Sequence, residues 1–475
     1  MLQALRLREL VATAVATVCL SGSGLAAAPR QTPIGPPTRP SQSPPADTSG
    51  RVSVTQAPPA AGVADGGLPR RPRVGLMVAE TPSGLVVRSV TPRSPAANAG
   101  IREGDVIANV NGAPMQTGAA FEARVRTMHA GEMVTITVVR GAEPLEVQVT
   151  PEEALREGDF DAKVEYNTFT GSGGRLRSVW AVPSRLPGGR VPAVLVVRGV
   201  GAPAADAPGN NPFRDLAFQL ARAGIVTIRY DAAGIGDSEG PPNSAVDFTT
   251  EVADARAALQ HVRNDPRVDP DRVFLLGQGT GGGVASVVTS SDHKVAGLVV
   301  IGIIARPVIE YLLDSRRQQL LLAGVPVGDI DDILRQHITI YAQLLENDGV
   351  PQPDELGVVA PDGTMMGKRG EFWKQYDQVN FGRLFAELTV PVMNVYGEFD
   401  FVSTLADHRA VADALREHSS QVQAIYIFDH TDHDLKSFDS RDAAFAAFGT
   451  DAPINERAVS AIADWVRAQV QQRGA

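Results

Sequence analysis

The stretch 272-RVFLLGQGTGGGVAS-286 gives the clearest structural signal in this chain of 475 residues. Its apolar first half is typical of a buried β-strand, and the small residues after Gly281 are typical of a tightly packed helix. Between these halves Gly277, Gly279 and Gly281 alternate with other residues, which favours a sharp turn because glycine adopts backbone conformations that other residues avoid. The stretch therefore predicts a strand, a turn centred on Gly279, and a helix.

The composition is that of a soluble globular protein with more than one domain. Hydrophobic residues make up 43% of the chain and charged residues 21%, both ordinary values. A length of 475 residues predicts two or three folded units. The net charge of −10 argues against a nucleic-acid partner, because such partners bind basic surfaces.

The N-terminal segment 1–28 has the order of a secretory signal peptide. Arg6 and Arg8 precede an apolar run over 10–20, and small residues follow this run. An uncleaved membrane anchor is the alternative, although the run is short for spanning a bilayer. Cys19, the only cysteine, lies inside this segment, so the mature chain would contain neither a thiol nor a disulfide. We therefore expect an exported protein, periplasmic or secreted.

Residues 29–71 are rich in Pro, Ser, Thr, Ala and Gly, as in 33-PIGPPTRPSQSPPADTSG-50. This composition has no apolar periodicity and cannot bury a core. We expect a disordered linker without a specific role beyond spacing.

The segment 94-SPAANAGIREGDVIANVNG-112 identifies the next unit, residues 72–151. Ser94 is placed to cap a short helix with Pro95 at its first position, and Asn111–Gly112 predicts a tight hairpin turn. Short β-type runs surround this segment. The whole region closely resembles the PDZ domains of bacterial HtrA-type proteins, so we expect a small, mainly β PDZ domain.

The PDZ resemblance implies a binding groove for the C-terminus of a peptide or protein. In such domains a peptide adds as a strand to the sheet edge, and backbone N–H groups of a loop hold its carboxylate. The alternative is a domain that packs on its neighbour and binds no free peptide. The resemblance places the groove at the loop Val74, Gly75, Leu76 and Met77 and at the helix containing Phe121 and Val125.

The third unit, residues 162–475, alternates strands and helices. Near-continuous apolar runs such as 191-VPAVLVV-197 are separated by amphipathic stretches such as 251–263. This pattern predicts an α/β fold with a doubly wound, mostly parallel sheet. Residues from about 306 to 388 contain helical patterns without a strand, and we interpret them as a helical lid.

Three segments of this unit resemble the α/β-hydrolase superfamily, in particular bacterial esterase- or aminopeptidase-like serine hydrolases with a helical lid. They are 220-LARAGIVTIRYDAAGIGDSEG-240, the helix–strand–turn run 251–283, and 390-VPVMNVYGEFDFV-402. The resemblance implies hydrolysis of an ester or amide by a nucleophile, an acid and a histidine in that chain order. Asp400 holds the place of the acid and His433 that of the histidine, with His430 as a second candidate.

The chain departs from the family pattern where the catalytic groups should be. Gly279 stands in place of the nucleophilic serine, so the turn reads G-x-G-x-G instead of G-x-S-x-G. The resemblance assigns the oxyanion and pocket positions to Arg198, Gly199 and Val200 and to the N–H of Thr280. Here Arg198 replaces the usual histidine. We therefore expect impaired serine catalysis and a site that binds a small acyl or peptide-like ligand.

Three alternatives remain at this point. Thr280, or a water activated by His433 and Asp400, could replace the serine in an active hydrolase. The glycines of 277–282 also satisfy the dinucleotide fingerprint G-x-G-x-x-G, which would imply an oxidoreductase. The loop 430–434 contains two histidines and two aspartates, but no further ligand group is identifiable, so we expect no metal and no cofactor.

Overall fold

The computed structural model describes residues 67–81, 83–158, 162–186, 188–346, 358–360, 363–418 and 425–474. The expected signal peptide and residues 29–66 of the expected linker lie outside these described residues. Within the described ranges, no helix is long and apolar enough to cross a membrane.

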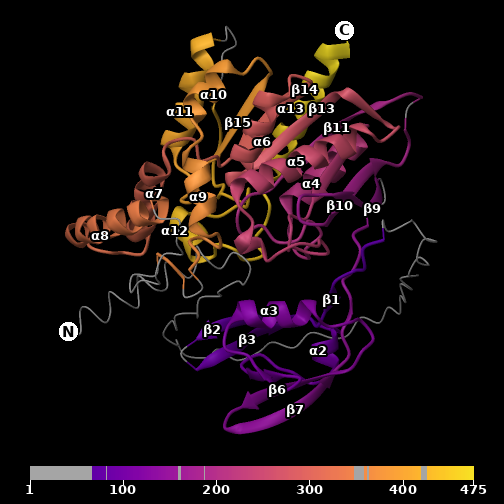
Figure 1. Ribbon diagram of the computed structural model, residues 1–475, viewed down its shortest axis with the longest axis vertical. Helices are drawn as coiled ribbons and strands as arrows, with labels where there is room; N and C mark the ends of the chain where they lie inside the picture. The colour runs from indigo at the N-terminus through magenta and orange to yellow at the C-terminus, as the bar shows by residue number, and fades with distance from the viewer. Residues whose placement is uncertain are drawn as a thin grey trace, which may run out of the picture.

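The N-terminal unit is an antiparallel sheet with two short helices (Figure 1). Its strands pair in the order β2-β3-β4-β6-β7, and β5 pairs with β4. Apolar side chains that alternate along these strands form one core with Ile101, Phe121 and Met128. The elements are β2 (Leu76–Thr81), β3 (Gly84–Val90), α2 (Pro95–Asn98), β4 (Val106–Val110), β5 (Ala113–Pro114), α3 (Gly118–Arg126), β6 (Val134–Arg140) and β7 (Glu143–Val149).

Two local predictions for this unit are confirmed. The Ser94 side chain accepts a hydrogen bond from the N–H of Ala97, and Pro95 opens helix α2. Asn111 and Gly112 have φ angles of 49° and 77°, the positive pair that a tight hairpin turn requires. The chemistry of single residues therefore fixes these turns before the sheet packs.

A two-stranded stalk joins this unit to the second one. Strand β1 (Pro72–Arg73) enters the N-terminal unit and pairs antiparallel with β8 (Glu152–Glu153), which leaves it. The chain therefore enters and leaves the N-terminal unit through two adjacent strands (Figure 1).

The second unit contains an eight-stranded sheet in the order β16-β15-β14-β13-β11-β12-β10-β9. The six strands from β16 to β12 run parallel, as the sequence predicted, whereas β10 and β9 extend the sheet in antiparallel pairing. The bounds are β9 (Ala162–Thr170), β10 (Arg175–Pro183), β11 (Val191–Val197), β12 (Val226–Tyr230), β13 (Val268–Gln278), β14 (Val295–Ile301), β15 (Val392–Gly397) and β16 (Ile425–Phe428).

Helices cover both faces of this sheet, which explains why its central strands are apolar at nearly every position. Helices α4 (Pro212–Arg222) and α13 (Glu456–Gly474) share a core with one face. Helices α5 (Phe248–Arg263), α6 (Thr280–Ser291) and α11 (Leu405–His418) share a core with the other. A short 3₁₀ turn, η1 (Asn243–Ala245), precedes α5, and α12 (Arg441–Ala446) precedes α13.

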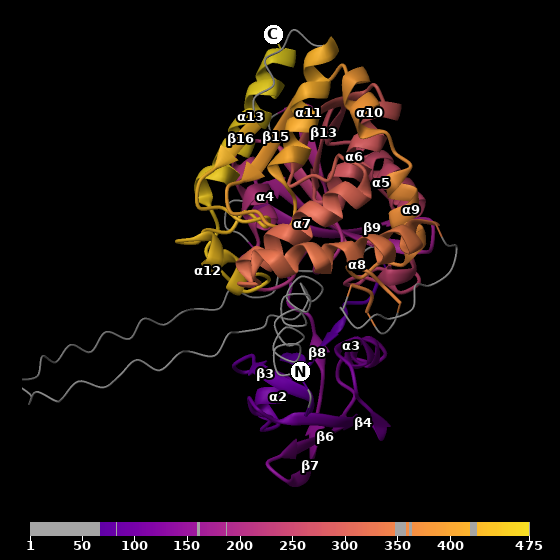
Figure 2. The same cartoon turned by 90° about the vertical axis from the view of Figure 1, so that its left-hand side faces the viewer.

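Among the described residues between β14 and β15, the expected lid contains the helices α7 (Val308–Leu322), α8 (Val327–Glu346), α9 (Gly370–Asp377) and α10 (Phe381–Glu387). Figure 2 shows α7 and α8 on the side of the hydrolase-like unit that faces the N-terminal unit. Aromatic contacts of Phe248 with Phe372 and Tyr376 fix α9 against α5.

A buried lysine anchors the lid to the strand–helix framework. The Nζ of Lys368 donates to the carboxylate of Glu251 at 2.6 Å and to the carbonyls of Asn243 at 2.8 Å and Val246 at 3.2 Å. The Lys368 side chain has no exposed surface. All three acceptors lie in or before helix α5, so this one ammonium group ties the lid to that helix.

We predict that Lys368→Met lowers the free energy of unfolding by about 3 kcal/mol, because it leaves the Glu251 carboxylate buried without its partner. Chemical denaturation followed by tryptophan fluorescence measures the change. Arg383→Met is the matched control, since Arg383 and Glu387 form an exposed pair that contributes little. Equal stability of the two variants would contradict the anchoring role of Lys368.

Candidate functional site

The turn between β13 and α6 has a backbone conformation that favours glycine. Gly279 has φ 59° and ψ −130°, and α6 begins directly after it at Thr280. The neighbouring backbone is also very close: a Cβ on Gly277 would lie 2.4 Å from the carbonyl oxygen of Gly281. The close backbone contacts therefore require glycine at 277 and at 281, where a Cβ would lie 2.5 Å from the carbonyl oxygen of Val197.

His433 and Asp400 form a buried pair beside this turn. Nδ1 of His433 lies 2.8 Å from Oδ2 of Asp400. The Asp400 carboxylate also accepts hydrogen bonds from the N–H groups of Val402 and Ser403 at 2.8 Å and from the Ser403 hydroxyl at 2.6 Å. The carboxylate is thus fixed on several sides and can orient the imidazole.

The pair is strongly polarised. Burial opposes both charges, but the charge of His433 and the hydrogen bonds at the site hold the pKa of Asp400 below its usual value. Burial would lower the pKa of His433, whereas the carboxylate of Asp400, with Asp434 and Asp432, raises it to about 9. The Asp400 carboxylate therefore favours the protonated form of the His433 imidazole.

The free nitrogen of His433 faces Gly279. A Cβ placed on Gly279 would lie 3.3 Å from Nε2 of His433. The structure therefore brings together Gly279, Asp400 and His433 from three different strand ends. Gly302, which sequence reasoning did not identify, makes room for the histidine: its Cβ would lie 2.6 Å from Nδ1 of His433.

The hydroxyl of Thr280 faces the loop after β11 instead of the histidine. Its Oγ1 accepts a hydrogen bond of 2.9 Å from the N–H of Val200. A Cβ on Gly199 would lie 2.7 Å from the carbonyl oxygen of Gln278, so this loop packs directly on the turn. Thr280 thus occupies the N–H of Val200, a residue that the sequence analysis placed among the oxyanion and pocket positions.

The guanidinium of Arg198 packs against helix α4. Its guanidinium carbon is 4.9 Å from the ring centroid of Phe213, which belongs to α4. Burial lowers the pKa of Arg198 from its ordinary value. This cation–π contact fixes the start of the loop after β11 against helix α4.

The second histidine candidate is not brought to Asp400. His430 is exposed, and its Nδ1 lies 3.0 Å from the carbonyl oxygen of Phe438. In the same loop Oδ1 of Asp432 accepts hydrogen bonds from the N–H groups of Asp434 and Lys436, so it shapes the loop. Within the described part of the chain, no group of His, Cys, Asp and Glu is arranged to hold a metal ion.

A cavity of about 450 Å³ is lined in part by residues that contact the backbone of Asp400, and its lining includes neither Gly279 nor His433. The Tyr396 hydroxyl and the Arg441 guanidinium, both in its wall, donate to the backbone carbonyl of Asp400 at 3.3 and 2.8 Å. Residues of the cavity wall therefore hold the backbone of Asp400, and the cavity is separate from the candidate site at Gly279.

The peptide-groove candidates of the N-terminal unit gather beside β2, an edge strand of its sheet. Gly75 has φ 81°, and a Cβ there would lie 2.2 Å from the Cβ of Ser94. Leu76 and Val125 are half-buried and Met77 is 43% exposed. Val74 and Phe121, by contrast, are buried in the core, so they support the groove from below.

Two known families match the two units. Residues 72–150 match the PDZ domain, and residues 210–322 match the family described as serine aminopeptidase, S33. The second match covers the β12 and β13 strands, the turn at Gly279 and the first lid helix.

Curated relatives agree with this division. The chain is 24% identical to esterase EstD of Thermotoga maritima over 58% of this chain and 62% of that protein. It is 27% identical to the quorum-quenching protein AidA of Acinetobacter baumannii over 23% of this chain and 34% of that protein. It is 39% identical to the periplasmic pH-dependent serine endoprotease DegQ of Escherichia coli over 14% of this chain and 15% of that protein. The chain thus spans less than two thirds of each of these relatives.

We predict that the imidazole of His433 titrates near pH 9 and that Asp400→Asn brings this pKa below 6.5, because burial then acts without the opposing carboxylate. NMR of the histidine-labelled chain measures the pKa of His433 in both variants. Asp413→Asn is the control, because it removes an exposed carboxylate. Since the folded-state pKa is raised, the pair stabilises the protein below about pH 6.5, and this contribution is lost as pH rises through 9. A titration of His433 that is the same in both variants would contradict the pairing.

We also predict that in a Gly279→Ser background, Thr280→Ala raises kcat for p-nitrophenyl acetate by about 100-fold, the usual effect of one oxyanion donor. The substitution frees the N–H of Val200. Thr289→Ala is the matched control, because Thr289 lies on the same helix and donates to Ala285. A lower kcat after Thr280→Ala would instead mean that the hydroxyl assists the reaction.

Proposed function

We propose that this chain, which consists of a PDZ domain joined to an α/β-hydrolase domain related to esterases, is an exported binding protein without serine catalysis. The PDZ groove takes the C-terminus of a peptide or protein. The hydrolase site holds a small acyl or peptide-like ligand and does not turn it over.

The observation that carries the proposal is the backbone of Gly279. It keeps a turn conformation suited to presenting a side chain, whose Cβ would lie 3.3 Å from Nε2 of His433, but glycine offers no oxygen or sulfur atom there. A nucleophile must be activated by the adjacent base, and here the base has nothing to deprotonate. The Asp400–His433 pair is retained, so the site remains polar and organised for a ligand.

The position of Thr280 supports the same proposal. Its hydroxyl is engaged with the N–H of Val200 and is directed away from the histidine, so it is poorly placed to replace serine. The same contact removes a donor from any oxyanion. Two features of a working acyl-transfer site are therefore altered at once.

The PDZ part of the proposal rests on the free edge of β2 and on the apolar groove residues Leu76 and Val125. An extended peptide adds to such an edge by main-chain hydrogen bonds. Export is supported by the N-terminal sequence and by the relative DegQ, which is described as periplasmic.

The test compares the unmodified chain with Gly279→Ser, using a fluorophosphonate probe and p-nitrophenyl acetate. We expect no covalent labelling and no turnover above background for the unmodified chain, and labelling of the serine variant at residue 279. Gly279→Ala is the matched control, since it adds the same Cβ strain without the hydroxyl.

Turnover by the unmodified chain that is abolished by His433→Gln would overturn the proposal. In that case a water or Thr280 serves as nucleophile. If neither chain reacts while the His433 titration shows an intact pair, the altered oxyanion donors are sufficient to prevent catalysis, and the Thr280→Ala variant then decides.

A further inference from the structure

The segment before the PDZ domain is docked in the hydrolase domain. The sequence analysis included residues 67–71 in a disordered linker, but Leu68 and Arg70 are only 3% and 5% exposed. The guanidinium of Arg177, on β10, donates to the carbonyl of Leu68 at 2.6 Å. A short arm, residues 67–71, is therefore part of the hydrolase framework, because it brings apolar surface and two cations to it.

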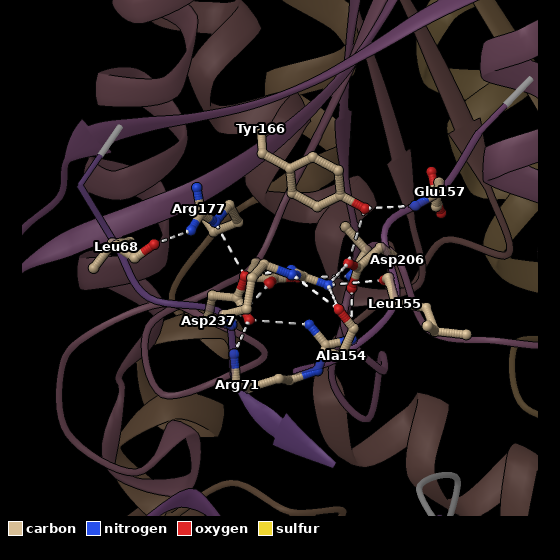
Figure 3. Close-up of polar contacts among 12 residues, drawn as sticks. Leu68, Arg71, Ala154, Leu155, Glu157, Tyr166, Arg177, Asp206 and Asp237 are labelled. Atoms are coloured by element: carbon tan, nitrogen blue, oxygen red, sulfur yellow. Dashed lines mark hydrogen bonds and ion pairs between the residues drawn. The ribbon is translucent and has the colours of Figure 1, made fainter. Parts of the chain in front are cut away.

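Two arginines of this arm bind two buried aspartates. Arg70 and Arg71 each pair with both Asp206 and Asp237, with 2.6 Å between each guanidinium and Asp206 (Figure 3). Arg177 adds a third cation to Asp237 at 3.2 Å. Burial would raise the pKa of Asp206, but Arg71 and Arg70 hold it below its usual value.

The two aspartates belong to loops at the carboxyl ends of strands β11 and β12, the same edge of the sheet as the turn at Gly279. Asp206 lies in the loop after β11, six residues beyond Val200, and Asp237 lies in the loop after β12. A third carboxylate, Asp231, joins the two loops, since it accepts the N–H of Ala205 at 2.6 Å and of Asp237 at 3.2 Å. Without the arm, Arg177 would be the one cation among the residues that the structure describes that still pairs with these three neighbouring carboxylates, and Asp206 would lose both of its arginine partners.

The arm also contacts the stalk that leads to the PDZ domain, because it directly precedes strand β1 and bonds to the residues after strand β8. Arg70 donates to the carbonyls of Ala154 and Leu155, which follow the outgoing strand β8, at 3.2 and 2.9 Å. Only Pro72 and Arg73 separate the arm from Val74 and Gly75, where the peptide-binding loop begins. Helix α3 of the groove lies on the side of the PDZ domain that faces the hydrolase domain (Figures 1 and 2).

We propose that Arg70 and Arg71 are positioning residues for the loop 198–211 of the hydrolase site, and that they couple this loop to occupancy of the PDZ groove. A peptide that changes the loop at Val74 and Gly75 acts on Arg71 and Arg70, which lie three and four residues before Val74 and hold Asp206. By linkage, a ligand in the hydrolase site changes peptide affinity by the same factor. The coupling rests on the proposed peptide binding, whereas the positioning role does not.

The first experiment is hydrogen–deuterium exchange of the full chain with Arg70→Gln. We expect segments 198–211 and 231–240 to exchange at least tenfold faster, while strand β14 is unchanged. Arg73→Gln is the matched control. Arg73 lies in stalk strand β1, three residues after Arg70, and its partner is the exposed Glu152 instead of a buried aspartate. Adding Asp206→Asn to Arg70→Gln should restore protection, because the unpaired charge is removed. If Arg70→Gln acted only through a lost packing contact, the added Asp206→Asn substitution would not restore protection from exchange.

The second experiment adds a peptide. The probe is an octapeptide with a free C-terminal valine, chosen by fluorescence anisotropy from an array of such peptides, with its C-terminal amide as control. We expect binding to change exchange in 198–211 at least threefold, and Arg70→Gln to abolish this change while the peptide still binds.

Three outcomes would overturn the proposal in distinguishable ways. If Arg70→Gln exchanges like the unmodified chain, Arg70 does not position the loop. If a peptide binds but leaves 198–211 unchanged, the two sites are not coupled. If no peptide of the array binds, the coupling and the proposed PDZ function fail together, while the exchange of Arg70→Gln still decides the positioning role. None of these readouts depends on whether the hydrolase site is catalytic.

Discussion

The close approach of backbone segments around the β13–α6 turn is the constraint on which the hydrolase domain depends. A Cβ on Gly281 would lie 2.5 Å from the carbonyl oxygen of Val197, and one on Gly277 would lie 2.4 Å from the carbonyl of Gly281. Strand β11, strand β13 and helix α6 therefore meet with no side chain between them. This contact fixes the loop after β11 against the turn, and it does so whether or not residue 279 carries a nucleophile.

The same constraint makes the form of the turn independent of the side chain at position 279. The turn is determined by packing of Gly277 and Gly281, while His433 is held separately by Asp400 and by the space at Gly302. A Cβ at position 279 would lie within 4 Å of His433 alone, so the absence of a side chain there removes no packing contact from the turn. This is consistent with the proposed use of the site for binding.

Charge compensation links the two domains in a different way. The carboxylates of Asp206 and Asp237 are almost completely buried, and such groups are tolerated only when paired. Their partners Arg70 and Arg71 come from the segment that leads into the PDZ domain. The PDZ domain is thus inserted between an arm and a strand that both belong to the hydrolase framework, and the stalk strands β1 and β8 close this insertion.

The sequence by itself determined the two domains, the parallel order of the central strands, the lid and the residues Gly279, Asp400 and His433, because these depend on local periodicity, turn chemistry and motif order. It did not reveal strands β9 and β10, whose residues mix buried apolar positions with the buried Arg177 and Ser178. It also placed the arm in a disordered linker, since a short Pro- and Arg-containing segment carries no pattern of its own. Only the tertiary structure decided that the Thr280 hydroxyl binds the N–H of Val200 and that Arg70 neutralises Asp206 and Asp237. These contacts join residues 80 to 167 positions apart, and no local preference of the chain encodes them.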